Sequence, residues 1–156
     1  MILRRPPRIT TLLSAAASGV FKGQDIPLAR DNSRRFAEVQ KGRVSDVEYE
    51  VNPGFIAGQK AIPVAAAGCY VPAGRYRHIA SAIMTVTTAK VAGCEHITVC
   101  SAPQPGVGLY PALVYAAHVS GADQIMALGG VAGVAPMAVG IFGPAQANSN
   151  PRPANP

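Results

Sequence analysis

The sequence contains no tryptophan, and acidic residues are scarce, with 8 Asp and Glu against 14 Lys and Arg among 156 residues. Only 14% of the residues are charged and 6% are aromatic, whereas 49% are hydrophobic. This composition is too apolar for a disordered chain, and its 16 glycines and 14 prolines favour an α/β interior built from small residues. The length is sufficient for one domain with a hydrophobic core.

The excess of positive charge is concentrated near the ends of the chain. Between residues 23 and 143, nine Lys and Arg face eight Asp and Glu, so this central region is close to neutral. We therefore expect no nucleic-acid partner. The alternative is binding of nucleic acid through Arg4, Arg5 and Arg8, which predicts an affinity that falls steeply with salt.

Cysteine is also scarce, and Cys69, Cys94 and Cys100 lack the C-x-x-C spacing of metal sites. Their apolar surroundings predict small core residues in a reducing, cytoplasmic compartment. The histidines are too far apart in the sequence to suggest a shared metal site. No apolar run is long enough to span a membrane, so we expect no membrane association. Residues 1–23 are expected to be an extension without fixed structure. Pro6-Pro7 and the shortness of the apolar run argue against a targeting segment at this end.

Hydrophobic periodicity predicts a helix, a ribbon and then alternating strands and helices. In residues 26–42, Leu28, Phe36 and Val39 recur near helical spacing, and residues 46–64 suggest two short strands joined by a turn. Further strands are expected in the run that ends at Tyr70 and in residues 96–103 and 123–128, with helices in residues 75–93, 109–122 and 131–140. The fold class predicted is α/β: an incomplete Rossmann-like parallel sheet with crossover helices, preceded by a helix and a short β-ribbon.

Two predicted strands end in breaks that could bind a ligand. Tyr70 is followed by Pro72-Ala73-Gly74, and the last strand by Gly129-Gly130. Ligands of parallel α/β sheets bind at the carboxyl ends of strands, where helix N-termini attract anions. The glycines lack the G-x-G-x-x-G spacing, so a tight turn without a ligand is an equal alternative. Tyr70 could contact a bound nucleotide at its strand end. The commoner arrangement for a tyrosine is a half-buried ring whose hydroxyl reaches solvent, and this is the alternative for Tyr70.

The C-terminal tail differs in composition from the rest of the chain. Residues 144–156 contain four prolines and three asparagines but no large apolar residue, which predicts disorder. The expected organisation is therefore an extension over residues 1–23, a partial α/β domain over residues 24–143 and the tail. The composition changes abruptly near Gly143.

Several short sequence motifs, in the same order along the chain, resemble those of the histidinol dehydrogenase family, which comprises NAD-dependent alcohol dehydrogenases. They are GCYVPAG at residues 68–74, TAKVAG at 88–93, VSGADQI at 119–125 and LGG at 128–130. The resemblance covers roughly residues 24–143. FAEVQKG, GQKAIPV and ASAIMTVTTAKVAG are more similar to its sulfopropanediol 3-dehydrogenase branch.

The resemblance implies NAD-dependent oxidation of a small-molecule alcohol, which in that branch is a small sulfonated diol. It also implies zinc as a second cofactor and a homodimer for full-length relatives. The residues implied to contact NAD are Tyr70, Gly74, Gly129 and Gly130. Ala73 replaces a family glycine, and its methyl either fits or clashes according to the backbone angle. Ala132 stands where the family has a glutamine that contacts NAD.

This sequence has no counterpart of three later features of the family. They are its G-P-G-N motif, its glutamate-histidine acid/base pair and its zinc ligands. No catalytic or metal-binding residue is therefore assigned. We expect a partial NAD-binding domain that is inactive alone. The alternative is a non-catalytic remnant or a weak nucleotide-binding module, and NAD binding and zinc content of dialysed protein would distinguish these possibilities.

Overall fold

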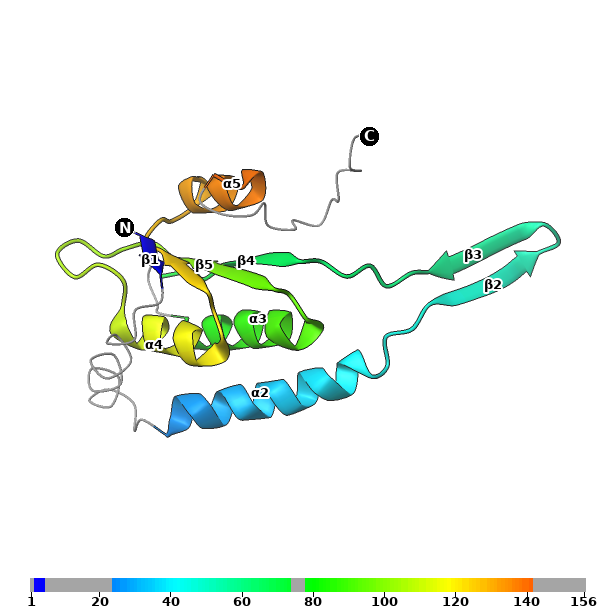
Figure 1. Cartoon of the computed structure of the whole chain (residues 1–156), viewed down its shortest axis with the longest axis horizontal. Coiled ribbons are helices and arrows are strands. Elements are labelled where there is room, and N and C mark those ends of the chain that lie inside the picture. The colour runs from blue at the N-terminus through cyan, green and yellow to red at the C-terminus, as the bar shows by residue number, and fades with distance from the viewer. Residues whose placement is uncertain (1, 5–23, 74–77, 142–156) are drawn as a thin grey trace.

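A sheet of four strands lies between two layers of helices (Figure 1). The computed structural model describes residues 2–4, 24–73 and 78–141. The strands occur in the order β1-β6-β5-β4, with β4 at Ala66–Tyr70, β5 at His96–Cys100 and β6 at Gln124–Met126 running parallel. The connections between them are α3 at Ile79–Ala92 and α4 at Pro111–Ser120. The incomplete Rossmann-like parallel sheet with crossover helices is therefore confirmed.

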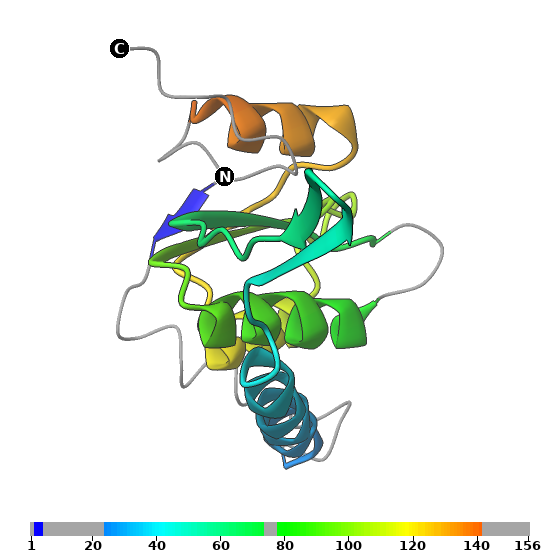
Figure 2. The ribbon, with the colours of Figure 1, turned by 90° about the vertical axis from the view of Figure 1, so that its right-hand side faces the viewer.

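The helices cover the two faces of the sheet unequally. Figure 2 shows α3 and α4 on one face, with α2 at Asp25–Lys41 packed beneath them, and α5 at Val131–Val139 on the other face. The larger core lies between the sheet and the layer of α3 and α4, where Val71, Ile97 and Leu113 are fully buried. Within the ranges described, no helix is long and apolar enough to cross a membrane.

Glycine and proline set the limits of α3 and α4. The predicted end of α3 at Gly93 is confirmed, whereas α4 is shorter at both ends than the predicted range of residues 109–122. Gly93 and Gly121 follow α3 and α4 with φ of 103° and 105°, a left-handed conformation that glycine adopts without steric cost. Pro111 occupies the start of α4, where its missing N–H removes no helical hydrogen bond. Pro136 lies inside α5, which nevertheless continues to Val139.

The edge strand β1 at Ile2–Arg4 was not predicted. It pairs antiparallel with β6, so a few residues of the segment expected to lack fixed structure belong to the sheet. Residues 5–23 and the tail from residue 142 lie outside the described residues. The predicted segment boundaries at residues 23 and 143 therefore stay predictions.

The buried face of α2 differs from the predicted one. Leu28, Phe36 and Val39 are 60%, 65% and 64% exposed, whereas Ile26 and Ala37 are buried. Ile26 belongs to the core beneath α3 and α4. The small Ala37 allows close approach of the helices, whereas the bulky residues at the predicted positions face solvent. Periodicity identified the helix correctly but assigned the wrong face.

The predicted ribbon is formed by β2 at Val47–Asn52 and β3 at Phe55–Gln59. It extends away from the sheet, and every residue of both strands is exposed (Figure 1). The turn is held by the Gly54 N–H, which donates to Glu50 Oε1 at 2.8 Å, and the base by the Ala61 N–H, which donates to Asp46 Oδ1 at 2.8 Å. A two-stranded ribbon is marginally stable in water by itself.

Candidate functional site

The carboxyl ends of the parallel strands lie at one edge of the sheet. Tyr70 pairs with Cys100, which in turn pairs with Met126, so the strands end in register. The Val71 N–H donates to the Cys100 carbonyl at 2.9 Å, and the Ser101 N–H donates to the Met126 carbonyl at 3.1 Å. The segments that follow β4 and β6 therefore leave the sheet together. This register brings Tyr70 and the Gly129-Gly130 turn to the same edge.

Tyr70 projects from the sheet face opposite α3 and α4. Side chains alternate along a strand, and its neighbours Cys69 and Val71 are buried in the core under those helices. Tyr70 therefore lies on the face of the sheet that α5 partly covers, and its exposed fraction is 39%. Its ring is thus available at the end of β4, as a nucleotide contact requires.

The strand end does not pass at once into a helix, contrary to the prediction from the sequence. α3 begins at Ile79, whereas the helical pattern was expected from residue 75. Gly74 and residues 75–77 lie outside the described residues, so the proposed contact at Gly74 stays a prediction. Ala73 is buried, and no non-glycine residue in the described ranges has a positive φ. The methyl of Ala73 therefore needs no backbone strain.

Gly129 is required by packing. A Cβ on Gly129 would lie 2.5 Å from the Ala102 Cβ and 3.0 Å from the Ala102 Cα, so a side chain cannot fit without movement of the backbone. Gly133 is similarly constrained, because its Cβ would lie 2.8 Å from the Leu128 carbonyl oxygen. These two glycines hold the turn and α5 against the sheet.

Gly130 has a different role, because its constraint is conformational. Its φ of 58° and ψ of −144° are rarely adopted by residues with a side chain, yet no atom lies within 4 Å of the position of a Cβ. The residue is the N-cap of α5, and its carbonyl accepts hydrogen bonds from the Gly133 and Val134 N–H groups at 3.1 and 3.2 Å. The first-turn N–H groups left without a helical acceptor are those of Val131 and Ala132. The side of Gly130 that lacks a Cβ is therefore open, beside a helix end suited to an anion such as a pyrophosphate.

The residues at this edge fit part of a dinucleotide. The open Gly130, the N-terminus of α5 and the exposed Tyr70 ring could hold a phosphate group and an aromatic base. Ala132, which replaces the family glutamine, lies exposed in the first turn of α5 and offers only its backbone. Contacts between NAD and the described residues at this edge would therefore be made mostly by main-chain groups.

The zinc implied by the resemblance does not fit the same region. No three His, Cys, Asp or Glu side chains within residues 2–4, 24–73 and 78–141 are grouped to hold a metal ion. His96 is engaged in the sheet, where its Nε2 lies 3.2 Å from Thr98 Oγ1. No metal-dependent step can be assigned to the described residues.

The cysteines are core residues, as predicted. Cys69, Cys94 and Cys100 are free and buried. Burial, with a smaller contribution from nearby Cys69, raises the pKa of Cys100 to about 11. Burial also raises the pKa of Cys69, although a hydrogen bond with Thr85 opposes that shift. Protonated, inaccessible thiols are poor nucleophiles, so neither Cys69 nor Cys100 is a catalytic candidate.

Sequence reasoning missed a second polar site, a basic pocket between α2, α3 and α4. It contains Arg30, Arg34 and Lys41 from α2. Their separations of four and seven residues place them on one face of a helix, which was the signal available in the sequence. The apolar residues of α2 predict a different buried face, so the pattern of hydrophobic residues does not reveal the basic one.

Comparison with known proteins gives the wider context. The family description "Histidinol dehydrogenase" matches residues 15–148. The chain belongs to the histidinol dehydrogenase family. It is 73% identical over 119 residues to "Sulfopropanediol 3-dehydrogenase" of Ruegeria pomeroyi, covering 76% of this chain and 27% of that protein. It is 52% identical over 119 residues to a "Histidinol dehydrogenase homolog" of Pelagibacter ubique, covering 76% of this chain and 28% of that protein.

A solved structure agrees with this assignment. The crystal structure of histidinol dehydrogenase from Elizabethkingia anophelis superposes with a TM-score of 0.64 at 27% sequence identity. The match covers 86% of this chain and 30% of that chain. The histidinol dehydrogenase family member described here thus spans about a quarter of the length of the relatives it matches.

Proposed function

We propose that this chain forms part of the NAD-binding domain of an alcohol dehydrogenase that oxidises a small sulfonated diol. The observation that carries the proposal is that the end of β4, with Tyr70, and the turn after β6, with Gly129 and Gly130, lie at the same edge of the sheet. The choice of substrate is supported by the 73% identity to sulfopropanediol 3-dehydrogenase of Ruegeria pomeroyi.

Each residue at the edge has a distinct part in this proposal. Gly130 leaves room for a pyrophosphate to approach the backbone, and the N–H groups of Val131 and Ala132 at the start of α5 donate to its oxygens. Gly129, packed on Ala102, fixes the turn that presents them. Tyr70 contacts the nucleotide with its ring or hydroxyl. Bound NAD⁺ supplies the acceptor for the hydride that leaves the carbinol carbon.

The alternative is a module that binds nucleotide without turnover. It uses the same strand edge and needs no metal site, and no group of three His, Cys, Asp or Glu side chains among the described residues could hold a metal ion. The zinc, the homodimer and the cytoplasmic location implied by the family stay predictions for this chain.

Calorimetric titration of the chain with NAD⁺ tests the binding step. We expect saturable binding that Tyr70→Ala weakens by roughly tenfold, the size typical of losing one aromatic contact to a base. Tyr49→Ala is the matched control, because Tyr49 is exposed on the ribbon away from the sheet edge. Absence of binding, or equal loss in both variants, would contradict the proposal.

Turnover is measured separately by adding a sulfonated diol and following NADH absorbance. Formation of NADH supports a dehydrogenase. Binding of NAD⁺ without NADH supports the nucleotide-binding module.

A further inference from the structure

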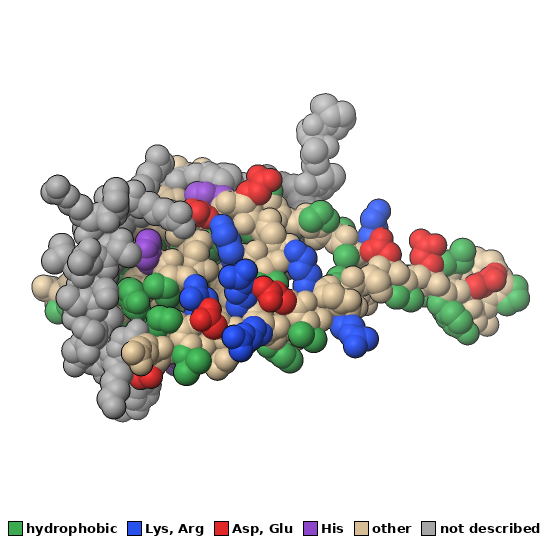
Figure 3. Space-filling view, turned by 60° about the horizontal axis from the view of Figure 1, so that its bottom comes forward, with side chains coloured by type: hydrophobic (Ala, Val, Ile, Leu, Met, Phe, Trp, Pro, Cys, Tyr) green, Lys and Arg blue, Asp and Glu red, His purple; other side chains and the backbone are tan. Residues whose placement is uncertain are grey.

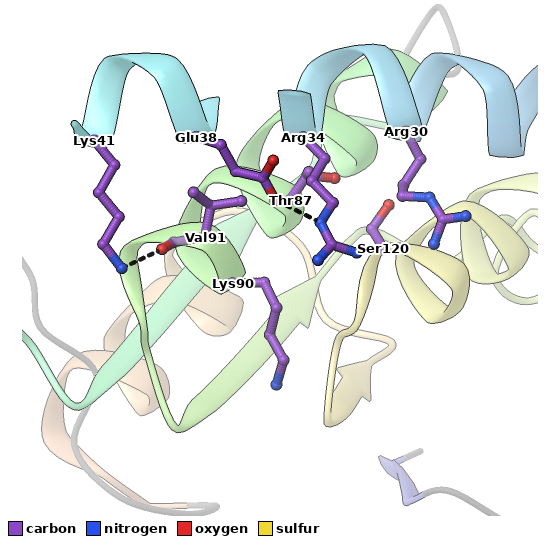
Figure 4. A pocket seen from close by; sticks show the side chains of 8 residues that line it. All are labelled: Arg30, Arg34, Glu38, Lys41, Thr87, Lys90, Val91 and Ser120. Carbon is purple, nitrogen blue, oxygen red and sulfur yellow. Dashed lines mark hydrogen bonds and ion pairs between the residues drawn. The ribbon is translucent and has the colours of Figure 1, made fainter. Parts of the chain in front are cut away.

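A basic pocket of about 530 Å³ lies between α2, α3 and α4, in the helical layer away from the strand-end site. Lys and Arg side chains gather over this part of the surface (Figure 3). The side chains that define the pocket come from all three helices (Figure 4). They are Arg30, Arg34, Lys41, Thr87, Lys90 and Ser120.

The pocket has an excess of positive charge. Four cationic side chains line it together with a single carboxylate, that of Glu38. Arg34 Nε donates to Glu38 Oε1 at 2.9 Å, and this ion pair leaves the other guanidinium N–H groups of Arg34 free to donate elsewhere. Lys90 has no partner among the described residues, and its aliphatic stem packs beside Gly121. Unneutralised charge therefore remains available for an anion.

Protein contacts hold two of the other cations in place. Arg30 Nη1 donates to the Val119 carbonyl at 3.2 Å, while its Nε lies 2.8 Å from Asp31 Oδ1. Lys41 Nζ donates to the Val91 carbonyl at 2.8 Å. These contacts fix the walls of the pocket before any ligand binds, which lowers the entropic cost of binding.

Two buried hydroxyl groups are also directed to this space. Thr87 and Ser120 are 2% and 6% exposed, and neither hydroxyl has a hydrogen-bond partner in the part of the chain that the structure describes. Figure 4 shows both beside Arg34, on the sides of α3 and α4 that face α2. Buried hydroxyls are normally paired, so these two point to a ligand that accepts hydrogen bonds.

We propose that this pocket binds the tetrahedral oxyanion of a small molecule, a phosphate or sulfonate group. Arg34 and Arg30 donate guanidinium N–H groups to its oxygens, Lys90 adds a mobile positive charge, and Thr87 and Ser120 donate their hydroxyls. The volume exceeds that of an isolated phosphate, so the group belongs to a larger molecule. The site is separate from the strand-end edge and does not depend on NAD binding there.

Calorimetric titration of the full chain with inorganic phosphate, without NAD and at constant ionic strength, tests this site. We expect saturable binding that Lys90→Gln weakens by about tenfold, as for loss of one charged contact. Lys60→Gln, which removes an exposed cation outside the pocket, should leave the affinity unchanged. No saturable binding, or equal losses in the two variants, would overturn the proposal.

Ser120→Ala tests the pocket without changing its charge. We expect a several-fold loss of phosphate affinity, because one donor is removed, with no loss of folding stability, because the hydroxyl is unpaired in the absence of ligand. Unchanged affinity would contradict the proposed role of the hydroxyl. Glycerol phosphate and propanesulfonate, titrated in parallel, then distinguish a phosphate source from a sulfonate source by their relative affinities.

Discussion

On the face that α3 and α4 cover, the sheet buries Val71, Ile97 and Val99 completely, and Leu113 of α4 packs against them in the same core. On the opposite face, α5 forms only a small cluster in which Met137 meets Cys100 and Met126. The two faces of one sheet thus differ in how much apolar surface they remove from water.

The α5 face has the smaller apolar cluster and is also the more polar one. Thr98 and Gln124 lie on it between neighbouring strands, and Tyr70 emerges from it at the strand end. Along α5 itself, Val131 is 82% and Val139 67% exposed. Because buried apolar area is the main favourable contribution to folding, the α3/α4 face, with its larger apolar cluster, contributes most of the stability of the fold.

Leu113→Ala should give the largest loss of stability. Leu113 is fully buried in the core beneath α3 and α4, so truncation removes apolar contacts and leaves a cavity. We expect the free energy of unfolding to fall by about 2–5 kcal/mol, measured by chemical denaturation. A fall below about 1 kcal/mol would show that this face does not provide the main core.

Gly129→Ala tests the packing of the α5 turn and should give an intermediate loss. The new Cβ collides with Ala102, so we expect a loss of about 1–3 kcal/mol by denaturation. Ala102→Gly removes one of the colliding atoms, and the double variant should recover part of the loss. Purely additive losses would mean that the contact with Ala102 is not the cause.

The buried Cys100 thiol predicts a change of stability at high pH. Its pKa is raised to about 11 in the folded chain from an ordinary value of 9.0, so the unfolded chain ionises first as pH rises. The contribution of the neutral thiol to stability is complete below pH 9 and is lost between pH 9 and about 11. Cys100→Ala should show a smaller decline over this range. If the free energy of unfolding declined equally with pH in both proteins, the raised pKa of Cys100 would be contradicted.

Val131→Ser should have the smallest effect. Val131 is the most exposed of the large hydrophobic residues of α5, so its replacement removes little buried surface. We expect the free energy of unfolding to change by less than about 0.5 kcal/mol, measured as for Leu113→Ala. A loss as large as that of Leu113→Ala would mean that both faces of the sheet are equally covered.

Local signals explain what the sequence predicted correctly. Gly93 ends α3 through its own backbone preference, as predicted, and Pro111 lies in the first turn of α4, where its fixed φ is tolerated. The strand ends could also be placed, because a parallel sheet with helical crossovers aligns them. These local signals were enough to predict the order of the elements and the position of Tyr70 and Gly129-Gly130 at one edge of the sheet.

Long-range packing explains what the sequence could not predict. The buried face of α2 depends on α3 and α4, so the apolar pattern of Leu28 and Phe36 was misleading. Nothing local distinguishes Gly129, which is required by contact with Ala102, from Gly130, which is required by its backbone angles. The basic pocket needs three helices together, and the partners of β1 are distant in the sequence.

NAD⁺ titration followed by amide chemical shifts of the isotope-labelled chain is the most direct test of the proposed nucleotide site. The account predicts saturable shifts at Tyr70, Gly129, Gly130 and the first turn of α5, with little change on the ribbon or around Lys90. Shifts confined to the basic pocket, or none that saturate, would contradict binding of NAD at the strand ends.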